Sequence, residues 1–227
     1  MDKEARRRVY DNLAPYYAWV RAPLAKRDRT METVLSSLPQ EVGHLLDLGT
    51  GPGVYAIEFA RRRPASKVRA VDFSSSFVRI AKERAKKEGL RNIEVSQGDA
   101  EALPFQDSAF DGIICGGVLS VVSDRTRAVH EVHRVLRPGG TLVIREPARN
   151  TDGKGKLVER LVGPAIGLAG KAFPAIKGLE KRVGLLFGHF DGEHFDRRDL
   201  DELLVQPGFA AVVIREEGTD LIAVCKR

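Results

Sequence analysis

The 227-residue sequence predicts an α/β fold built on a mostly parallel sheet, and three observations support this prediction. Short β-type runs alternate with helical patterns along most of the chain, a spacing typical of right-handed βαβ units with parallel strands. The last two β-type runs are separated only by Gly218 and its neighbours, so we expect them to pair antiparallel. The hydrophobic fraction, 43%, is enough to bury a core at this length.

The expected strands and helices follow from these patterns. The β-type runs cover residues 44–49, 67–73, 92–98, 110–117, 141–147, 209–217 and 219–227. The helical patterns cover residues 1–38, 54–64, 76–90, 124–140 and 197–208. Ser75 or Ser76 is expected to cap the helix at 76–90, and Pro138 to end the helix that starts at 124. Residues 148–196 interrupt the alternation, and their apolar, Gly-rich centre predicts a helical cap insertion, which is either packed on the domain or a lid over the substrate.

Composition excludes several classes of protein. The chain has no apolar run of about 18 residues, so no transmembrane helix is expected. Its charged first residues do not resemble a secretory signal, which predicts a cytoplasmic protein. Cys115 and Cys225 lack the spacing of a metal site, so we expect reduced thiols and no bound metal. The 37 basic and 31 acidic residues give a formal net charge of +6 on a mostly mixed surface.

The first stretch with a chemical signature is LLDLGTGPG, residues 45–53, at the end of the first β-type run. A glycine loop between a strand and a helix lets a ligand lie against bare backbone, beside the free N–H groups of the helix. A dinucleotide favours a third glycine where this chain has Val54, and Pro52 removes one N–H donor, so a nicotinamide-dependent oxidoreductase is disfavoured. A ligand that carries the carboxylate and the ammonium group of an α-amino acid fits this loop better, because Asp47 lies beside it. The candidate residues are Asp47, Gly49, Thr50, Gly51 and Gly53.

Acids also follow the next two β-type runs. Asp72 ends the second run, where a doubly wound fold places an acid that accepts hydrogen bonds from ribose hydroxyls. Phe73 is placed to lie on an adenine face, and Asp99, followed by Ala100, to accept from an adenine amine. The carboxyl ends of parallel strands meet at one edge of the sheet, so these residues are expected to converge. The ligand implied is an adenosine joined to an amino acid.

These motifs resemble those of the class I S-adenosylmethionine-dependent methyltransferases over most of the chain. The stretch LLDLGTGPG is similar to the cofactor loop of that family, and AVDFS is similar to the segment that carries its ribose-binding acid. The stretch QGDAEALPFQDSAFD is similar to the adenine-binding segment. The stretch EVHRVLRPGGTLVIREP is similar to the helix and the fifth strand that follow. The resemblance implies S-adenosyl-L-methionine as cofactor and S-adenosyl-L-homocysteine as product. It implies a Rossmann-like, seven-stranded, mostly parallel sheet with an antiparallel last strand and helices on both faces. It also implies that Gly116 contacts the cofactor.

The N-terminal segment VYDNLAPYYAWV is similar to that of the ubiquinone/menaquinone C-methyltransferases and their small-molecule relatives. This resemblance assigns Tyr17 to the methionine end of the cofactor, although Ala18 replaces the acid that usually follows. One methyltransferase domain is implied over residues 1–227. Its parts are an N-terminal helical cap (1–38), a cofactor-binding core (39–147), a cap insertion (148–196), and a terminal helix with a β-hairpin (197–227).

The reaction implied is an in-line displacement at the sulfonium methyl, for which the protein must position a nucleophile and exclude water. The apolar insertion favours a small lipophilic acceptor such as a quinone precursor, an isoprenoid or a lipid. Its basic segment, residues 153–182, predicts that the protein can also lie peripherally at a membrane. His189 and His194 are the candidates for a catalytic base.

Two alternatives remain at this point. An RNA methyltransferase is disfavoured because the fourth β-type run, FDGIICGGVLSVV, lacks the Asn/Asp-Pro-Pro-aromatic signature of enzymes that grip a flipped base. The basic clusters also lack the interleaved aromatic residues on which bases stack. The second alternative is an S-adenosylmethionine-binding protein without catalysis, which would keep the glycine loop and the acids but lack an acceptor pocket.

Overall fold

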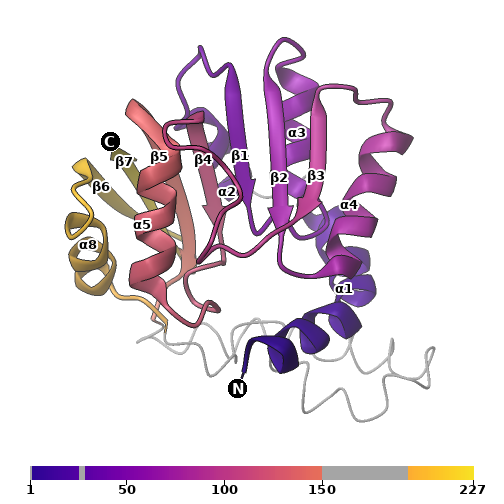
Figure 1. Cartoon of the computed structure of the whole chain (residues 1–227), viewed down its shortest axis with the longest axis horizontal. Coiled ribbons are helices and arrows are strands. Elements are labelled where there is room, and N and C mark those ends of the chain that lie inside the picture. Colours follow the sequence, from indigo (N-terminus) through magenta and orange to yellow (C-terminus); the bar gives the residue numbers. More distant parts are fainter. Residues whose placement is uncertain (1, 26–28, 150–193) are drawn as a thin grey trace.

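The structure, a computed structural model, describes residues 2–25, 29–149 and 194–227. Within these ranges seven strands form one sheet in the order β3-β2-β1-β4-β5-β7-β6 (Figure 1). The strands are β1 His44–Leu48, β2 Lys67–Asp72, β3 Ile93–Gln97, β4 Phe110–Gly116, β5 Leu136–Pro147, β6 Ala210–Glu217 and β7 Asp220–Lys226. Strands β1 to β5 pair in parallel, and β7 runs antiparallel to both of its neighbours. The predicted mostly parallel sheet with an antiparallel last strand is therefore confirmed.

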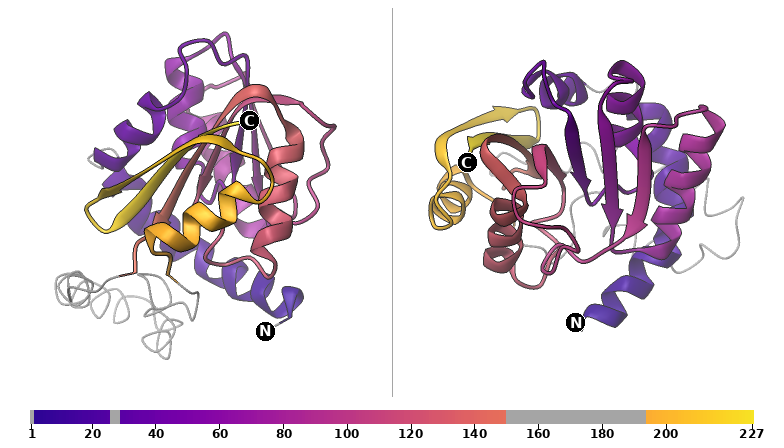
Figure 2. Two further views of the ribbon diagram at one scale, coloured as in Figure 1. Left: turned by 90° about the vertical axis from the view of Figure 1, so that its left-hand side faces the viewer. Right: turned by 45° about the horizontal axis from the view of Figure 1, so that its top comes forward.

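Helices cover both faces of the sheet, as predicted (Figure 2). They are α1 Lys3–Ala25, α2 Arg29–Ser36, α3 Val54–Arg62, α4 Ser75–Lys87, α5 Arg125–Val135 and α8 Arg197–Val205. Successive residues of a strand point to opposite faces, so the buried central strands contribute to two cores. In β1, Leu45 packs with residues of α2, α3 and α4, whereas Leu46 packs with residues of α5 and α8.

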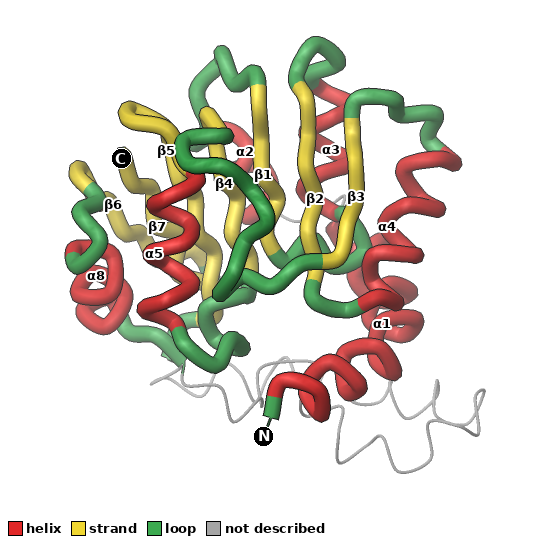
Figure 3. Tube along the Cα trace, in the orientation of Figure 1, coloured by secondary structure: helices red, strands yellow, loops and turns green. Residues whose placement is uncertain are grey.

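The chain order of the strands creates a crevice at one edge of the sheet. From β1 the chain proceeds outward to β2 and β3 and then returns to β4 on the other side of β1. The connections on the two sides of this switch point diverge, which opens a crevice at the carboxyl ends of the strands. Helix α1 runs along that edge, beside α4 (Figures 1 and 3). The predicted N-terminal helical segment thus lies next to the predicted ligand edge.

Two predicted boundaries differ from the structure. Helix α5 ends at Val135 instead of Pro138, because Leu136 already pairs with Phe110 and starts β5. The Arg227 side chain donates hydrogen bonds to the backbone carbonyls of Arg134 and Leu136, one on each side of this helix end. Such long-range contacts leave no local sequence signal.

Helix α4 is capped one residue earlier than predicted, and the insertion lies mostly outside the described residues. The Ser74 side chain, instead of Ser75 or Ser76, accepts a hydrogen bond from the backbone N–H of Phe77 at 3.2 Å. Of the expected insertion, residues 150–193 are not described. Its two ends lie side by side, because Ala148 forms a β-bridge with Phe195. Among the described helices, none has the length and hydrophobicity needed to cross a membrane.

Candidate active site

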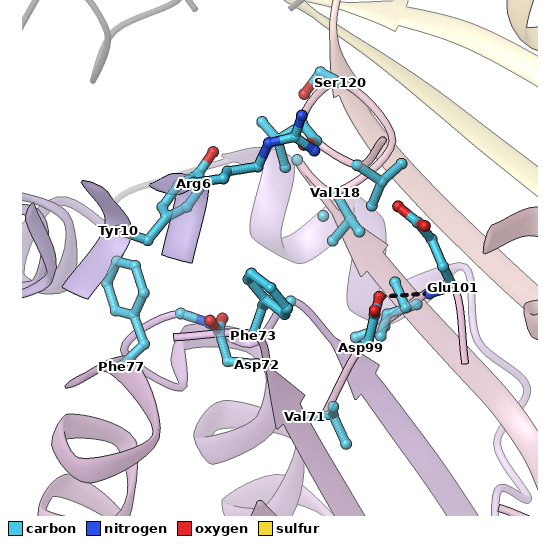
Figure 4. A pocket seen from close by; sticks show the side chains of 18 of the residues that line it. Arg6, Tyr10, Val71, Asp72, Phe73, Phe77, Asp99, Glu101, Val118 and Ser120 are labelled. Atoms are coloured by element: carbon cyan, nitrogen blue, oxygen red, sulfur yellow. Dashed lines mark hydrogen bonds between the residues drawn. The ribbon is translucent and has the colours of Figure 1, made fainter. Parts of the chain in front are cut away.

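A pocket of about 260 Å³ lies between the carboxyl edge of the sheet and helix α1. Its floor is formed by the glycine loop and the strand ends, and its roof by one face of α1 (Figure 4). The predicted residues that line it are Tyr17, Gly49, Gly51, Asp72, Phe73, Asp99, Ala100, Gly116 and His194. Asp47, Thr50 and Gly53 are not among the lining residues. The structure thus brings most of the predicted residues to one cavity and places three of them beneath its surface.

The glycine loop needs its glycines for two different reasons. Gly49 and Gly51 have φ angles of +67° and +53°, a conformation that residues with a Cβ rarely adopt. A Cβ on Gly49 would lie 2.2 Å from Cγ2 of Val118, so this position is required by packing. A Cβ on Gly51 would point toward the Tyr17 ring, at 3.9 Å, and into the pocket. Gly51 therefore keeps the surface open to a ligand, and Gly49 keeps the loop folded.

Asp47 lies below the loop and shapes it. Its side chain is 1% exposed, and Oδ2 accepts hydrogen bonds from Thr50 Oγ1 at 2.6 Å and from the backbone N–H of Ala56 at 3.0 Å. Burial raises the pKa of Asp47 to about 7, because a charged carboxylate loses its hydration there. Asp47 and Thr50 thus connect the strand end, the loop and the first turn of α3.

Asp72 lies at the end of β2 with its carboxylate facing the pocket. Oδ2 accepts from the backbone N–H of Gly51 at 2.7 Å, and Oδ1 accepts from that of Ser74 at 2.9 Å. Burial raises its pKa to about 6, so the carboxylate is mostly ionised at neutral pH. An ionised carboxylate offers roughly four acceptor sites, which leaves capacity for hydroxyl donors after these two bonds. Phe73 lies beside it on the floor (Figure 4).

Asp99 at the end of β3 is bonded to a residue of the roof. Its Oδ1 accepts from the backbone N–H of Glu101 at 2.9 Å, and its Oδ2 lies 2.7 Å from Lys3 Nζ. The same Nζ lies 2.7 Å from Glu101 Oε2. Glu101 also accepts from the backbone N–H of Ser123 at 2.8 Å. The first turn of α1 is therefore tied to the segment in which the sequence predicted an adenine contact.

The roof was predicted only in part. Five residues of α1 line the pocket: Lys3, Arg6, Tyr10, Leu13 and Tyr17. Of these, only Tyr17 was predicted from the sequence. Their spacing of three and four residues places them on one face of a helix, so this periodicity could have found them. The Tyr17 ring meets the Phe77 ring edge-on at 5.5 Å, which packs the roof against α4.

The loop after β4 forms one wall of the pocket and rests on a buried acid. Glu146 has no exposed surface, and its Oε1 accepts from the backbone N–H of Leu119 at 2.8 Å. Oε2 accepts more weakly from the backbone N–H of Ser120, at 3.3 Å. Burial raises the pKa of Glu146 to about 7. No local pattern points to this residue, because its partners lie 26 and 27 positions away in the sequence.

The structure describes only one of the two predicted histidines. His194 lines the pocket, whereas His189 lies outside the described residues. His194 immediately precedes Phe195, whose backbone carbonyl accepts from the N–H of Arg149 at 2.8 Å. This pairing holds the start of the C-terminal segment, with His194, at the pocket.

The pocket residues fit an adenosine joined to an amino acid. The open backbone at Gly51 and the acceptor capacity of Asp72 are the two features that such a ligand needs, and they lie in one cavity. Cys115 and Cys225 are buried free thiols. Within the described ranges no group of three or more His, Cys, Asp or Glu side chains could hold a metal ion.

Comparison with known proteins agrees with this geometry. A family model described as "Methyltransferase domain" matches residues 46–144. A demethylmenaquinone methyltransferase of Lactococcus lactis subsp. lactis is 33% identical over 186 residues, 79% of this chain and 70% of that protein. A demethylmenaquinone methyltransferase of Thermus thermophilus is 33% identical over 144 residues, 61% of this chain and 64% of that protein. The matched segment thus covers between three and four fifths of the chain.

Solved structures share the fold. A SAM dependent methyltransferase from Aquifex aeolicus has a TM-score of 0.70 and 21% identity, covering 94% of this chain and 97% of that chain. The [4+2]-cyclase SpnF is 34% identical, covers 55% of this chain and 47% of that chain, and has a TM-score of 0.52. The first of these supports the fold alone, and the relative from Lactococcus lactis establishes the family. The chain belongs to the S-adenosylmethionine-dependent methyltransferases, and S-adenosylmethionine is its cofactor.

Proposed function

We propose that the chain transfers the methyl group of S-adenosylmethionine to a small lipophilic acceptor, namely a quinone precursor with a hydroxylated ring. The observation that carries this proposal is the division of the pocket into a polar floor and an apolar remainder. Apolar side chains from the roof, from α4 and from the β4 loop extend the cavity beyond the acids: Leu13, Phe77, Val118, Val121 and Val122. The relatives named demethylmenaquinone methyltransferases support the same class of acceptor.

Each floor residue has a proposed role toward the cofactor. Asp72 accepts hydrogen bonds from the ribose hydroxyls, and Phe73 packs against the adenine. Asp99 and Ala100 contact the adenine edge. Close approach of the amino-acid part is allowed by the bare backbone of the following residues: Gly49, Gly51 and Gly116.

Other residues act one step further from the cofactor. Asp47, Thr50 and Gly53 hold the glycine loop in shape from below the pocket surface. Tyr17 covers the methionine end of the cofactor from the roof.

Methyl transfer requires the protein mainly to position the acceptor. The cofactor supplies a methyl group already activated by the sulfonium, so the pocket must align the acceptor and exclude water. Helix α1 covers the floor and serves the second purpose. We assign His194 as the base that takes a proton from the acceptor, because it is the histidine that the described residues place in the pocket wall.

A methyl-transfer assay tests the proposed function. The full chain is incubated with methyl-labelled S-adenosylmethionine and one of three acceptors: demethylmenaquinol in phospholipid vesicles that contain anionic lipid, the same quinol in neutral detergent, or total RNA. We expect label in the quinol in both lipid media, faster with anionic vesicles if the protein also works at a membrane surface. Label in RNA, or none in any arm despite S-adenosylhomocysteine binding, contradicts the proposal. The last outcome would favour a different chemistry on this fold, as in the cyclase SpnF.

A further inference from the structure

Arg6 places a cation in the pocket wall, and the assignment of the floor leaves its charge unexplained. The residue lies on the pocket face of α1, and its Nη1 donates to the backbone carbonyl of Val121 at 2.6 Å and to Ser123 Oγ at 3.0 Å. Figure 4 shows its guanidinium extending toward the loop that carries Ser120, on the other side of the cavity from Asp72.

The guanidinium of Arg6 differs from the neighbouring cations of the same helix in what faces it. Lys3 contacts two carboxylates, and Arg7 pairs with Glu4 at 2.6 Å. Among the residues that the structure describes, no carboxylate lies within ion-pair distance of Arg6. A guanidinium carries five N–H donors, and both hydrogen bonds of Arg6 leave from Nη1. The donors on Nε and Nη2 are available to a ligand in the cavity.

Cofactor binding adds to the unbalanced positive charge at Arg6. The sulfonium adds a positive charge to a largely apolar cavity of about 260 Å³. Of the two cations that line it among the described residues, Lys3 is paired with Asp99 and Glu101, whereas Arg6 has no carboxylate partner. Like charges that share a water-poor site repel strongly, and an anion placed between them relieves the repulsion of both. An arginine also presents a planar fork that matches a carboxylate or a similar anionic oxygen. The carboxylate of the cofactor is assigned to the glycine loop, which lies with Asp72 across the cavity from Arg6, so the acceptor is the molecule that can supply an anion next to Arg6.

We propose that Arg6 binds an anionic oxygen of the acceptor and thereby selects acceptors that carry a carboxylate or a phenolate on an apolar ring. The inference rests on the proposed methyl transfer and adds the charge of the acceptor to it. It separates Arg6 from the floor residues: they bind the cofactor, whereas Arg6 distinguishes one acceptor from another.

A purely structural role for Arg6 predicts a different pattern. If the residue only ties α1 to the β4 loop, its loss loosens the whole roof. Binding of S-adenosylhomocysteine, of an anionic ring and of a neutral ring should then weaken together. An acceptor-binding role instead affects the anionic ring alone, and this contrast defines the experiment.

The test measures binding to the full chain saturated with S-adenosylhomocysteine. Calorimetry compares 2-naphthoate with 2-naphthamide, two rings of nearly equal shape of which only the first is charged. The wild type should prefer naphthoate by roughly 10- to 100-fold, the range for hydrogen bonds to charged groups. Arg6→Met should lose that preference, and Arg6→Lys should keep part of it. The matched control is Arg8→Met, which removes an exposed arginine of the same helix that does not line the pocket.

Several outcomes would overturn the inference. No preference for naphthoate in the wild type rejects it without any variant, and so does an unchanged preference in Arg6→Met. A parallel loss of S-adenosylhomocysteine affinity in Arg6→Met and Arg6→Lys identifies a structural tie instead. The source of the anion is decided by methyl transfer at varied pH: a phenolate acceptor gains rate as its hydroxyl ionises, and a carboxylate acceptor does not. Failure of methyl transfer to quinol, with the naphthoate preference intact, would contradict the proposed function and leave the role of Arg6 standing.

Discussion

On the floor of the pocket, Asp72 accepts hydrogen bonds from the backbone N–H groups of Gly51 and Ser74 and is shielded from water. On the roof, Lys3 reaches Asp99 and Glu101 through a side chain that is 45% exposed. Buried carboxylates that bond to backbone amides fix the path of the chain itself, whereas exposed ion pairs contribute little and are screened by salt. The comparison teaches that the floor is held in place by buried contacts to the backbone, and that the roof is fastened separately over it.

The largest effect should come from filling the floor. Gly51→Val adds a β-branched side chain at a φ of +53° and directs it into the pocket. We expect affinity for S-adenosylhomocysteine to fall by at least about 100-fold in calorimetry, because both the strain and the added volume act at the ligand surface. Gly218→Val, at a φ of +64° in the last hairpin with open space around it, is the matched control for backbone strain. Equal losses of affinity in the two variants would show that strain alone is responsible.

Removing the charge of Asp72 should have the next largest effect. Asp72→Asn should weaken S-adenosylhomocysteine binding by roughly 10- to 100-fold, the range for hydrogen bonds to a charged group. Because the pKa of Asp72 is about 6 in the free protein, wild-type affinity should also fall as the pH drops from 7.5 to 5. The variant should lack this slope.

A suitable control for Asp72 lies at the opposite edge of the sheet. Asp111 Oδ2 accepts from the backbone N–H groups of Gly43 and His44 at 2.7 and 2.8 Å, without lining the pocket. Asp111→Asn should therefore lower stability and leave cofactor affinity unchanged. If it weakens cofactor binding as much as Asp72→Asn does, the role assigned to Asp72 is not supported.

Loosening the roof should have a smaller effect, visible in rates. Lys3→Met removes both ion pairs to Asp99 and Glu101. Surface ion pairs contribute about 0–1 kcal/mol, so S-adenosylhomocysteine should dissociate roughly 2- to 5-fold faster in stopped-flow measurements. Raising the salt concentration should speed dissociation from the wild type and change the variant little. A wild-type rate that does not respond to salt would show that the roof is not held by these charges.

The smallest effect on ligand binding is expected for Asp47, whose role shows in stability. Asp47 forms no ion pair among the described residues, whereas Asp99 and Glu101 pair with Lys3 of the roof. Burial raises the pKa of Asp47 to about 7 in the folded state. The stability that this group contributes is present below pH 4, where it is protonated in both states, and is lost as the pH rises through 7. The Tm of the wild type minus that of Asp47→Asn should therefore decline between pH 4 and 8. Each kcal/mol of unfolding free energy should shift the Tm by about 2–4 °C in a protein of this size. A constant difference would mean that Asp47 stays charged throughout.

The same contrast explains how much could be predicted from the sequence. The floor is made of short local patterns, in which an acid or a glycine follows a hydrophobic strand, and the parallel topology brings Asp72 and Asp99 to one edge. The roof depends on contacts between residues far apart in sequence, such as Lys3 with Asp99 and Arg6 with Val121. No local pattern predicts which strand end a helix will reach. For that reason Tyr17 was found only through a family resemblance.

The role predicted for Asp47 differs from the role that the structure gives it. Asp47 was selected as a partner for a ligand charge, yet its oxygen is bonded to Thr50 and Ala56 below the surface. Sequence patterns show that an acid belongs beside a glycine loop, but they do not show which side of the loop it supports. Glu146 was missed for the complementary reason, because its role depends on the β4 loop folding back over β5.

The spacing of the roof residues has a consequence for how acceptor preference can diverge. Lys3, Arg6, Tyr10, Leu13 and Tyr17 occupy one face of a single continuous helix. Under the proposed function, substitutions at Arg6, Tyr10 and Leu13 alter the surface that meets the acceptor without touching the glycine loop, whereas Lys3 and Tyr17 lie at the two ends of the cofactor. Exchanging the middle of this helical face between relatives is thus a compact route to new acceptors, for natural selection and for a combinatorial library confined to a few codons of one helix.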